Sequence, residues 1–193
     1  MPLRDEQSDA FVIAESLSSP QSFSTIFDRH FTVIHAYLAR RVGGPGADDL
    51  AAETFVIAFE RRRTFSTSAG SARPWLFGIA TNLLRNKWRA DRRADHAVVE
   101  LAAVERERTS GREADLEAQE VLAAVAALDP DQRDALLLYA WEGLSYEEIG
   151  DALGVAVGTV RSRISRGRGR LRELLEPPPL SPFIAPQEPG DGS

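Results

Sequence analysis

The first half of the chain carries apolar residues at helical spacing. They recur at three- and four-residue intervals over 23–34 and again over 50–59, which predicts two helices that each bury one face. A glycine-rich turn at 43–46 separates the two. Asp48 and Asp49 are predicted to open the second helix, where their charges suit the positive end of its dipole.

A polar stretch over 64–73 ends this pattern. A third helix is predicted to begin at Pro74, because proline suits a first helical position. Trp75 and Trp88 fall at apolar positions of that helix, so we expect them to pack in the core rather than to stack on a ligand. Residues 95–114 are charged and alanine-rich without a sustained apolar stripe, a pattern that indicates a linker.

Helix boundaries are marked most clearly in a second helical block over 115–176. Asp129 followed by proline predicts a helix start, and Ser145 with Glu148 predicts a capping box. Gly154 is predicted to end the short helix that Ser145 begins. The turn after it leads into a longer helix that starts at about residue 157.

These last elements have the spacing of a helix-turn-helix. A helix over 145–153, the turn 154–156 and a helix from Val157 fit that motif, whose second helix enters the major groove of DNA. A plain helical hairpin with the same spacing is the alternative. If the motif is present, the helix from Val157 is the one that reads DNA.

The helix from Val157 has two dissimilar faces. One face is apolar and is predicted to be buried; it consists of Val160, Ile164, Gly167, Leu171, Leu174 and Leu175. The opposite face is a ridge of small residues between two rows of arginines, which permits close approach to a groove while the arginines reach phosphates and guanine edges. The predicted DNA contacts are Thr159, Arg161, Ser162, Ser165 and Arg166. Glycines in the helix cost about 1 kcal/mol each, so fraying beyond Arg166 is the alternative.

Composition narrows the function classes. The 193 residues are 43% hydrophobic, without cysteine and with three histidines whose spacing does not suggest a metal site. No phosphate loop or nucleophile motif is present, so we expect neither enzymatic activity nor a cofactor. No apolar run approaches the roughly 20 residues of a membrane-spanning helix, and the acidic N-terminus lacks the layout of a signal peptide. The expected location is the cytoplasm.

The net charge of −6 hides a strong segregation of charge. Five cations and one acid lie between Arg85 and Arg93, and six arginines without an acid lie between Arg161 and Arg172. Residues 95–134 carry eleven acids against four arginines. Two basic blocks separated by an acidic one suit two DNA-contacting elements joined by a segment that avoids DNA. Ordinary solvated faces are the alternative.

Two parts of the chain resemble one protein family. Leu144–Gly150 with Gly154–Ile164 is similar to the fourth conserved region of extracytoplasmic-function sigma factors, promoter-recognition subunits of bacterial RNA polymerase in the sigma-70 family. Asp48–Phe55 resembles the helix of the second region that docks on the polymerase clamp, and Pro74–Asn82 resembles the start of the DNA-melting helix.

The resemblance implies an all-α fold of two small helical domains joined by a flexible linker. Residues 8–94 would bind the polymerase clamp and recognise and melt the −10 element, and 95–114 would be the acidic linker. Residues 115–176 would be the helix-turn-helix domain for the −35 element. The last segment, 177–193, holds six prolines and is expected to be a disordered tail.

The resemblance also assigns residues to sites. A base-capturing loop and the helix after it would bind the −10 element through Phe65, Ser66, Thr67, Ser68, Arg73, Asn82, Arg85, Asn86 and Arg89. Strand opening needs such a cationic surface with a pocket for an unstacked base. The five predicted DNA contacts of the long helix would read the −35 element. Polymerase would be bound by Asp48, Asp49, Ala52 and Glu53, although the family usually has glutamine at position 52.

The implied partners are core RNA polymerase, through the clamp and flap of its large subunits, and promoter DNA. Such a protein joins the nucleoid when bound to polymerase and needs no membrane. Anti-sigma factors are common partners in the family, and the sequence leaves open whether one exists here. Two other functions remain as alternatives: a conventional helix-turn-helix regulator, which leaves the first helical block unexplained, and a protein-binding adaptor, which leaves the arginine rows unexplained.

Overall fold

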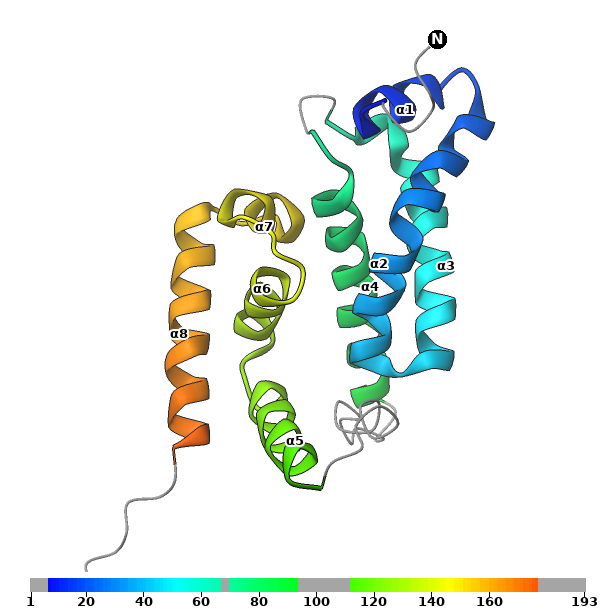
Figure 1. Cartoon of the computed structure of the whole chain (residues 1–193). Coiled ribbons are helices and arrows are strands. Elements are labelled where there is room, and N and C mark those ends of the chain that lie inside the picture. The colour runs from blue at the N-terminus through cyan, green and yellow to red at the C-terminus, as the bar shows by residue number, and fades with distance from the viewer. Residues whose placement is uncertain (1–6, 67–69, 94–111, 177–193) are drawn as a thin grey trace, which may run out of the picture.

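The computed structural model describes residues 7–66, 70–93 and 112–176, which are helical and contain no strand (Figure 1). The first half contains α1 (Asp9–Glu15), η2 (Pro20–Phe23), α2 (Ser24–Val42), α3 (Gly44–Arg61), η3 (Arg62–Thr64) and α4 (Arg73–Arg93). The second half contains α5 (Arg112–Ala126), α6 (Pro130–Ala140), α7 (Tyr146–Leu153) and α8 (Val157–Leu175). The predicted all-α class is confirmed. The tail 177–193 and most of the predicted linker lie outside the described residues.

Helices α2, α3 and α4 pack side by side and form the core of the first half (Figure 1). Their buried faces follow the predicted helical spacing, with Ile34, Leu38 and Leu84 fully buried between them. Trp75 and Trp88 are half-buried against this core, as predicted. None of the described helices is both long enough and apolar enough to span a bilayer.

The start of α3 differs from the prediction. Gly43 alone makes the turn, with φ of 80°, and α3 begins directly after it, with Pro45 in its first turn. Asp48 and Asp49 therefore lie in the second turn and do not open the helix. The field of a helix end decays within one turn, so dipole compensation does not account for these two exposed carboxylates.

The helix caps of the second half are confirmed. Asp129 accepts hydrogen bonds from the backbone N–H groups of the two residues after Pro130, at 3.0 and 3.3 Å. Ser145 accepts from the N–H of Glu148 at 3.2 Å, and Glu148 accepts from the N–H of Ser145 at 2.8 Å. Gly154 caps α7 in the left-handed conformation, with φ of 65°.

Helix α8 is continuous from Val157 to Leu175, so fraying beyond Arg166 does not occur. Gly167 is buried where α8 crosses α6, which explains a small residue at that point. The predicted buried face holds for Val160 and Ile164, but Leu174 and Leu175 are 36% and 42% exposed. This end of α8 lies beyond α6 and beside α5 (Figure 1).

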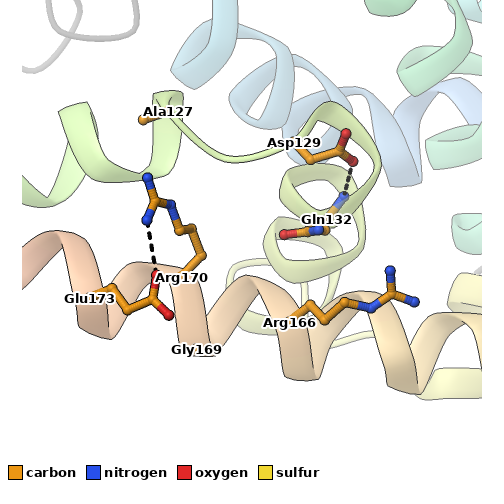
Figure 2. Close-up of a pocket in the computed structure, with 7 residues that line it drawn as sticks. All are labelled: Ala127, Asp129, Gln132, Arg166, Gly169, Arg170 and Glu173. Carbon is orange, nitrogen blue, oxygen red and sulfur yellow. Dashed lines mark hydrogen bonds and ion pairs between the residues drawn. The ribbon is translucent and has the colours of Figure 1, made fainter.

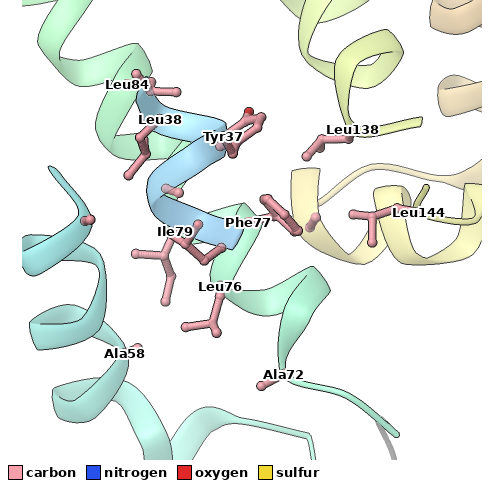
Figure 3. Close-up of a cluster of buried hydrophobic side chains, with 14 of the residues drawn as sticks. Tyr37, Leu38, Ala58, Ala72, Leu76, Phe77, Ile79, Leu84, Leu138 and Leu144 are labelled. Carbon is pink, nitrogen blue, oxygen red and sulfur yellow. The ribbon is translucent and has the colours of Figure 1, made fainter. Parts of the chain in front are cut away.

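The two halves of the molecule are in contact. Helix α4 packs against α7 so closely that a Cβ placed on Gly78 would lie 2.5 Å from the carbonyl oxygen of Ala152. Figure 3 shows Leu138 and Leu144 from the second half beside Phe77 of α4. One apolar cluster therefore runs through both halves.

Candidate nucleic-acid interface

The exposed face of α4 carries three of the residues predicted to bind the −10 element. Asn82, Asn86 and Arg89 are exposed and lie four and three residues apart, which places them on one helix face. The guanidinium of Arg89 donates to the side-chain oxygen of Asn86 at 2.7 Å. Amide and guanidinium groups in a row can donate to phosphates and to base edges.

Two other predicted −10 residues are engaged by the second half. The Nε of Arg85 donates to Asp134 at 2.7 Å, and its Nη2 donates to Asp131 at 2.8 Å. Arg73 donates to the backbone carbonyl of Glu142 at 3.1 Å. In this arrangement both arginines bind α6 and the turn after it.

The loop before α4 is only partly described. Phe65 is 8% exposed and its ring lies 5.1 Å from that of Trp75. Its ring, at the end of η3, packs in the core, while its predicted contact with DNA stays a prediction. Ser66 is exposed, and Thr67 and Ser68 lie outside the described residues.

A buried ion pair lies at the centre of the contact between the halves. Arg41 on α2 and Asp134 on α6 are 2% and 0% exposed and form a hydrogen-bonded pair. Arg41 also donates to the hydroxyl of Tyr37 at 2.7 Å and lies 4.8 Å from the ring centre of Trp88. Burial raises the pKa of Tyr37, so its hydroxyl stays neutral. Removing one member of such a pair costs about 3–5 kcal/mol, because the other charge is left buried.

Further ion pairs surround this centre. Asp131 binds Arg163 of α8 as well as Arg85, and Arg40 of α2 binds Glu142. Burial raises the pKa of Glu142, while the charges of Arg40 and Arg73 oppose that shift. The acids of α6 and the turn after it therefore meet the arginines of the first half directly.

Sequence reasoning missed these acidic residues as partners of the arginines that are predicted to bind the −10 element. Asp131 and Asp134 were counted with the acidic segment, and nothing in their spacing shows which cation they meet. For Asp134 the available signal was that it precedes the apolar run Ala135–Leu138 of the same helix, where a buried carboxylate needs a partner.

Helix α8 presents the residues predicted to read the −35 element. Thr159, Arg161, Ser165 and Arg166 are exposed, and Ser162 is half-buried. The Nε of Arg166 lies 3.1 Å from the hydroxyl of Ser162. The structure thus brings all five predicted residues to one side of α8.

Shallow depressions lie on both sides of this ridge. One, of about 390 Å³, includes Arg168 and Arg172 beside Arg161 and Ser165. Arg168 and Arg172 extend the cationic surface beyond the predicted set, and the arginine row that contains them was the signal for this extension. The other, of about 460 Å³, lies between α8 and the start of α6; Figure 2 shows Arg166 and Gly169 on its α8 side.

The predicted polymerase-binding residues form a third surface, on α3. Asp48, Asp49, Ala52 and Glu53 are all exposed, and Val56 continues the same face with 57% of its area exposed. The Nε2 of His35 lies 2.8 Å from a carboxylate oxygen of Asp48. An acidic face with an exposed apolar residue suits a basic protein partner.

Comparisons with known proteins match both halves. Residues 26–94 match the family model described as sigma-70 region 2, and residues 118–171 match sigma-70 region 4. The match to region 2 accounts for the first helical block, which the alternative of a conventional helix-turn-helix regulator leaves unexplained.

Named relatives agree with the family models. The chain is 40% identical over 130 residues to the ECF RNA polymerase sigma factor EcfG of Rhodopseudomonas palustris, covering 67% of this chain and 71% of the relative. It is 35% identical over 162 residues to the RNA polymerase sigma factor CarQ of Myxococcus xanthus, covering 80% and 89%.

Solved structures show the same fold. The structure of CnrH in complex with the cytosolic domain of CnrY matches with a TM-score of 0.63 and 27% identity over 88% of this chain and 97% of that one. The sigma factor RpoE in complex with the anti-sigma factor NepR, from Bartonella quintana, matches with a TM-score of 0.60 and 27% identity over 80% and 97%. With both sigma-70 regions in order, this chain belongs to the sigma-70 family and is an RNA polymerase sigma factor of the extracytoplasmic-function class.

Proposed function

We propose that the two domains divide promoter recognition as the family's regions do. The domain of residues 8–94 binds the polymerase clamp through the acidic face of α3 and holds the −10 element through α4 and the loop before it. The domain of residues 115–176 reads the −35 element through α8. The protein has no catalytic activity of its own, since RNA synthesis belongs to polymerase.

The observation that carries this assignment is the pair of exposed cationic helix faces on separate domains. Arg89 with its neighbouring asparagines lies on α4, and Arg161 with Arg166 lies on α8. A protein of net charge −6 that keeps two such faces concentrates its attraction for DNA at two places. Two places are what a two-part promoter needs.

Promoter binding in this scheme requires the domains to separate. Arg73 and Arg85 cannot contact a DNA strand while they bind the carbonyl of Glu142 and the carboxylates of Asp131 and Asp134. Polymerase binding would supply the energy for this separation, because it anchors the domains at distant sites. The free chain is accordingly expected to bind promoter DNA weakly.

An anti-sigma factor is the further partner that we propose. The similar sigma factor RpoE was captured with the anti-sigma factor NepR. A protein that stabilises the contact between the two domains would keep Arg73 and Arg85 occupied and so keep this chain inactive.

Run-off transcription with core polymerase tests the assignment. The full chain is added to core enzyme, and promoters are selected from a random-sequence pool by the transcripts they yield. The proposal predicts two sequence blocks separated by a fixed spacing. Selection of a single block, or transcription that does not depend on the added chain, would contradict it.

A further inference from the structure

Two tyrosine rings of the second domain lie in contact with each other. Tyr139 is on α6, Tyr146 is the first residue of α7, and both are half-buried. Their ring centres are 5.3 Å apart, and the angle between the ring planes is 35°. The two rings therefore form one aromatic pair, which connects α6 with α7.

The turn between α6 and α7 brings the two rings together. In this turn the N–H of Leu144 donates to the carbonyl oxygen of Leu138 at 3.2 Å, and Gly143 takes the left-handed conformation with φ of 66°. The capping box at Ser145 then fixes the start of α7. The position of the aromatic pair is thus determined by the backbone on both sides of it.

A guanidinium group of α8 lies over each ring. The Cζ of Arg161 is 5.9 Å from the ring centre of Tyr146, and the Cζ of Arg168 is 5.0 Å from that of Tyr139. Both distances are within the range of about 6 Å over which a ring face attracts a cation. Tyr146 also lines the depression of about 390 Å³ that contains both arginines. The aromatic pair therefore lies behind the cationic surface of α8.

The charges of Arg161 and Arg168 stay available to a ligand. On the other side of α8, Arg163 is paired with the carboxylate of Asp131. Within the part of the chain that the structure describes, neither Arg161 nor Arg168 forms an ion pair. An aromatic ring attracts a cation without neutralising its charge. The tyrosines can thus hold these two arginines while leaving their attraction for phosphates intact.

We infer that Tyr139 and Tyr146 are positioning residues for −35 recognition: their rings hold Arg168 and Arg161 in the orientation in which these arginines meet DNA. A free arginine side chain loses rotamer freedom when it binds a ligand, which opposes binding. A planar guanidinium that already lies over a ring loses less. The inference rests on the proposed function of α8 and requires no contact between the tyrosines and DNA.

A purely structural role of the tyrosines predicts a different result. If the aromatic pair only packs α6 against α7, loss of the Tyr146 ring lowers DNA binding equally with and without an arginine at position 161. If the ring acts through Arg161, its loss has no effect once Arg161 is absent. Variants at the two positions therefore separate the two roles when they are combined.

The test is a double-mutant cycle in the holoenzyme, assembled from core polymerase and the full chain. Tyr146→Leu, which keeps an apolar side chain but removes the ring, is made alone, with Arg161→Ala and with Arg172→Ala. Arg172 is the matched control, because it lines the same depression but lies over no ring of the described residues. Fluorescence anisotropy measures the affinity for a −35 duplex from a promoter selected with the wild-type holoenzyme.

Tyr146→Leu should weaken binding about two- to fivefold, the value of a cation–π contact at an exposed site. It should weaken binding by the same factor in the Arg172→Ala background and not at all in the Arg161→Ala background. Tyr146→Phe should restore the wild-type affinity, because phenylalanine keeps the ring and loses only the hydroxyl. Tyr139→Leu should show the same dependence on Arg168.

Equal factors for Tyr146→Leu in all three backgrounds would overturn the inference and leave the proposed function intact. A loss for Tyr146→Phe as large as that for Tyr146→Leu would also overturn it, because the hydroxyl and not the ring would then be responsible. If Arg161→Ala itself leaves −35 binding unchanged, the proposed function of α8 fails, and the inference fails with it.

A second variant covers the case in which Tyr146→Leu does not fold. A trifluorinated phenylalanine at position 146 nearly keeps the shape of the phenylalanine ring, but its fluorine atoms withdraw the negative charge from the ring face that attracts a cation. Compared with Tyr146→Phe, it should weaken −35 binding when Arg161 is present and not when position 161 is alanine. Equal affinities of the fluorinated and ordinary phenylalanine variants in the presence of Arg161 would overturn the inference.

Discussion

Ser145 makes a clear contribution at the scale of one residue. Its hydroxyl accepts from the N–H of Glu148 at the start of α7, an amide that would otherwise lack a helical partner. Ser145→Ala should therefore lower the free energy of unfolding by about 1 kcal/mol, measured by urea denaturation of the full chain. Ser165→Ala on the exposed face of α8 is the control and should change it little. Equal urea midpoints for Ser145→Ala and Ser165→Ala would show that the cap contributes nothing to the free energy of unfolding.

Asp9 gives the stability of the chain a pH dependence of known sign. Burial alone would raise the pKa of Asp9, but its hydrogen bonds with His30 and Ala72 hold that pKa below the ordinary value, so the unfolded chain binds the proton more readily than the folded one. The stabilisation is fully present above the unfolded pKa of about 3.9 and is lost as the pH falls through the lower folded pKa. Urea denaturation should show the gap between wild type and Asp9→Asn shrinking below about pH 4. A gap that stays constant down to pH 3 would rule out this role of the ionised carboxylate.

Single residues could be predicted where the reason is local. The exposure of Asn82 and Arg89 follows from helical periodicity, and the capping role of Ser145 follows from the residues beside it. The partner of Asp134 could not be predicted, because Arg41 lies 93 residues earlier in the chain. The burial of Phe65 could not be predicted for a related reason: it depends on Trp75, which lies beside Phe65 only once η3 and α4 are packed together.

At the scale of elements, α8 should separate base readout from general attraction. Arg161→Ala or Arg166→Ala should cost about 1–3 kcal/mol of binding to the −35 element and weaken discrimination among −35 sequences. Arg172→Ala is the matched control: it lies eleven residues beyond Arg161, about 16 Å along the helix. Arg172→Ala should lose a similar amount of binding free energy on all −35 sequences. The measurement is holoenzyme binding to −35 duplexes that differ at single base pairs, and unchanged discrimination in both variants would exclude the face assigned to α8.

The exposed face of α3 permits a gain-of-function prediction. Ala52 lies exposed among the acids of that face, where the resembled family usually has glutamine. Ala52→Gln should raise the affinity for core polymerase about fivefold, the value of one net hydrogen bond. Competition against a labelled sigma factor for core enzyme measures this. Ala123→Gln, at an exposed position of α5, is the control and should leave the affinity for core polymerase unchanged. An equal change in affinity for Ala52→Gln and Ala123→Gln would contradict a specific contact at position 52.

Element boundaries were predictable where a cap specifies them and less so elsewhere. Asp129, Ser145 and Gly154 mark helix ends through hydrogen bonds or backbone conformation available to neighbouring residues. The start of α3 was misplaced because glycine and proline usually indicate a turn, yet Pro45 also fits the first turn of a helix.

At the scale of the whole molecule, the sequence predicted two domains but not their contact. Segregated charge was expected to keep the acidic segment away from DNA, whereas the structure uses Asp131 and Asp134 to bind Arg85. Such a contact joins residues about 50 positions apart and leaves no periodic trace in either segment. It places Arg85, which is predicted to bind the −10 element, and its acidic partners within one chain.

The closeness of α4 and α7 offers a way to open this contact without touching its charges. A Cβ on Gly78 would lie 2.5 Å from the oxygen of Ala152 and 3.2 Å from its Cα. Real Cβ atoms do not approach backbone this closely, so α7 must move away. Alanine is also the better helix former, by about 0.5–1 kcal/mol, so α4 itself should not be weakened.

Gly78→Ala should therefore separate the domains of the free chain. We expect a larger radius of gyration in small-angle X-ray scattering with unchanged helix content in circular dichroism. Binding of single-stranded −10 DNA should strengthen about tenfold if the closed form holds nine chains in ten, because Arg85 is released. Gly169→Ala is the matched control, since no atom lies within 4 Å of its added Cβ; it should scatter like the wild type. Unchanged scattering of Gly78→Ala would mean that the contact adjusts without opening, and stronger binding without expansion would mean that Arg85 is not restrained by the domain contact.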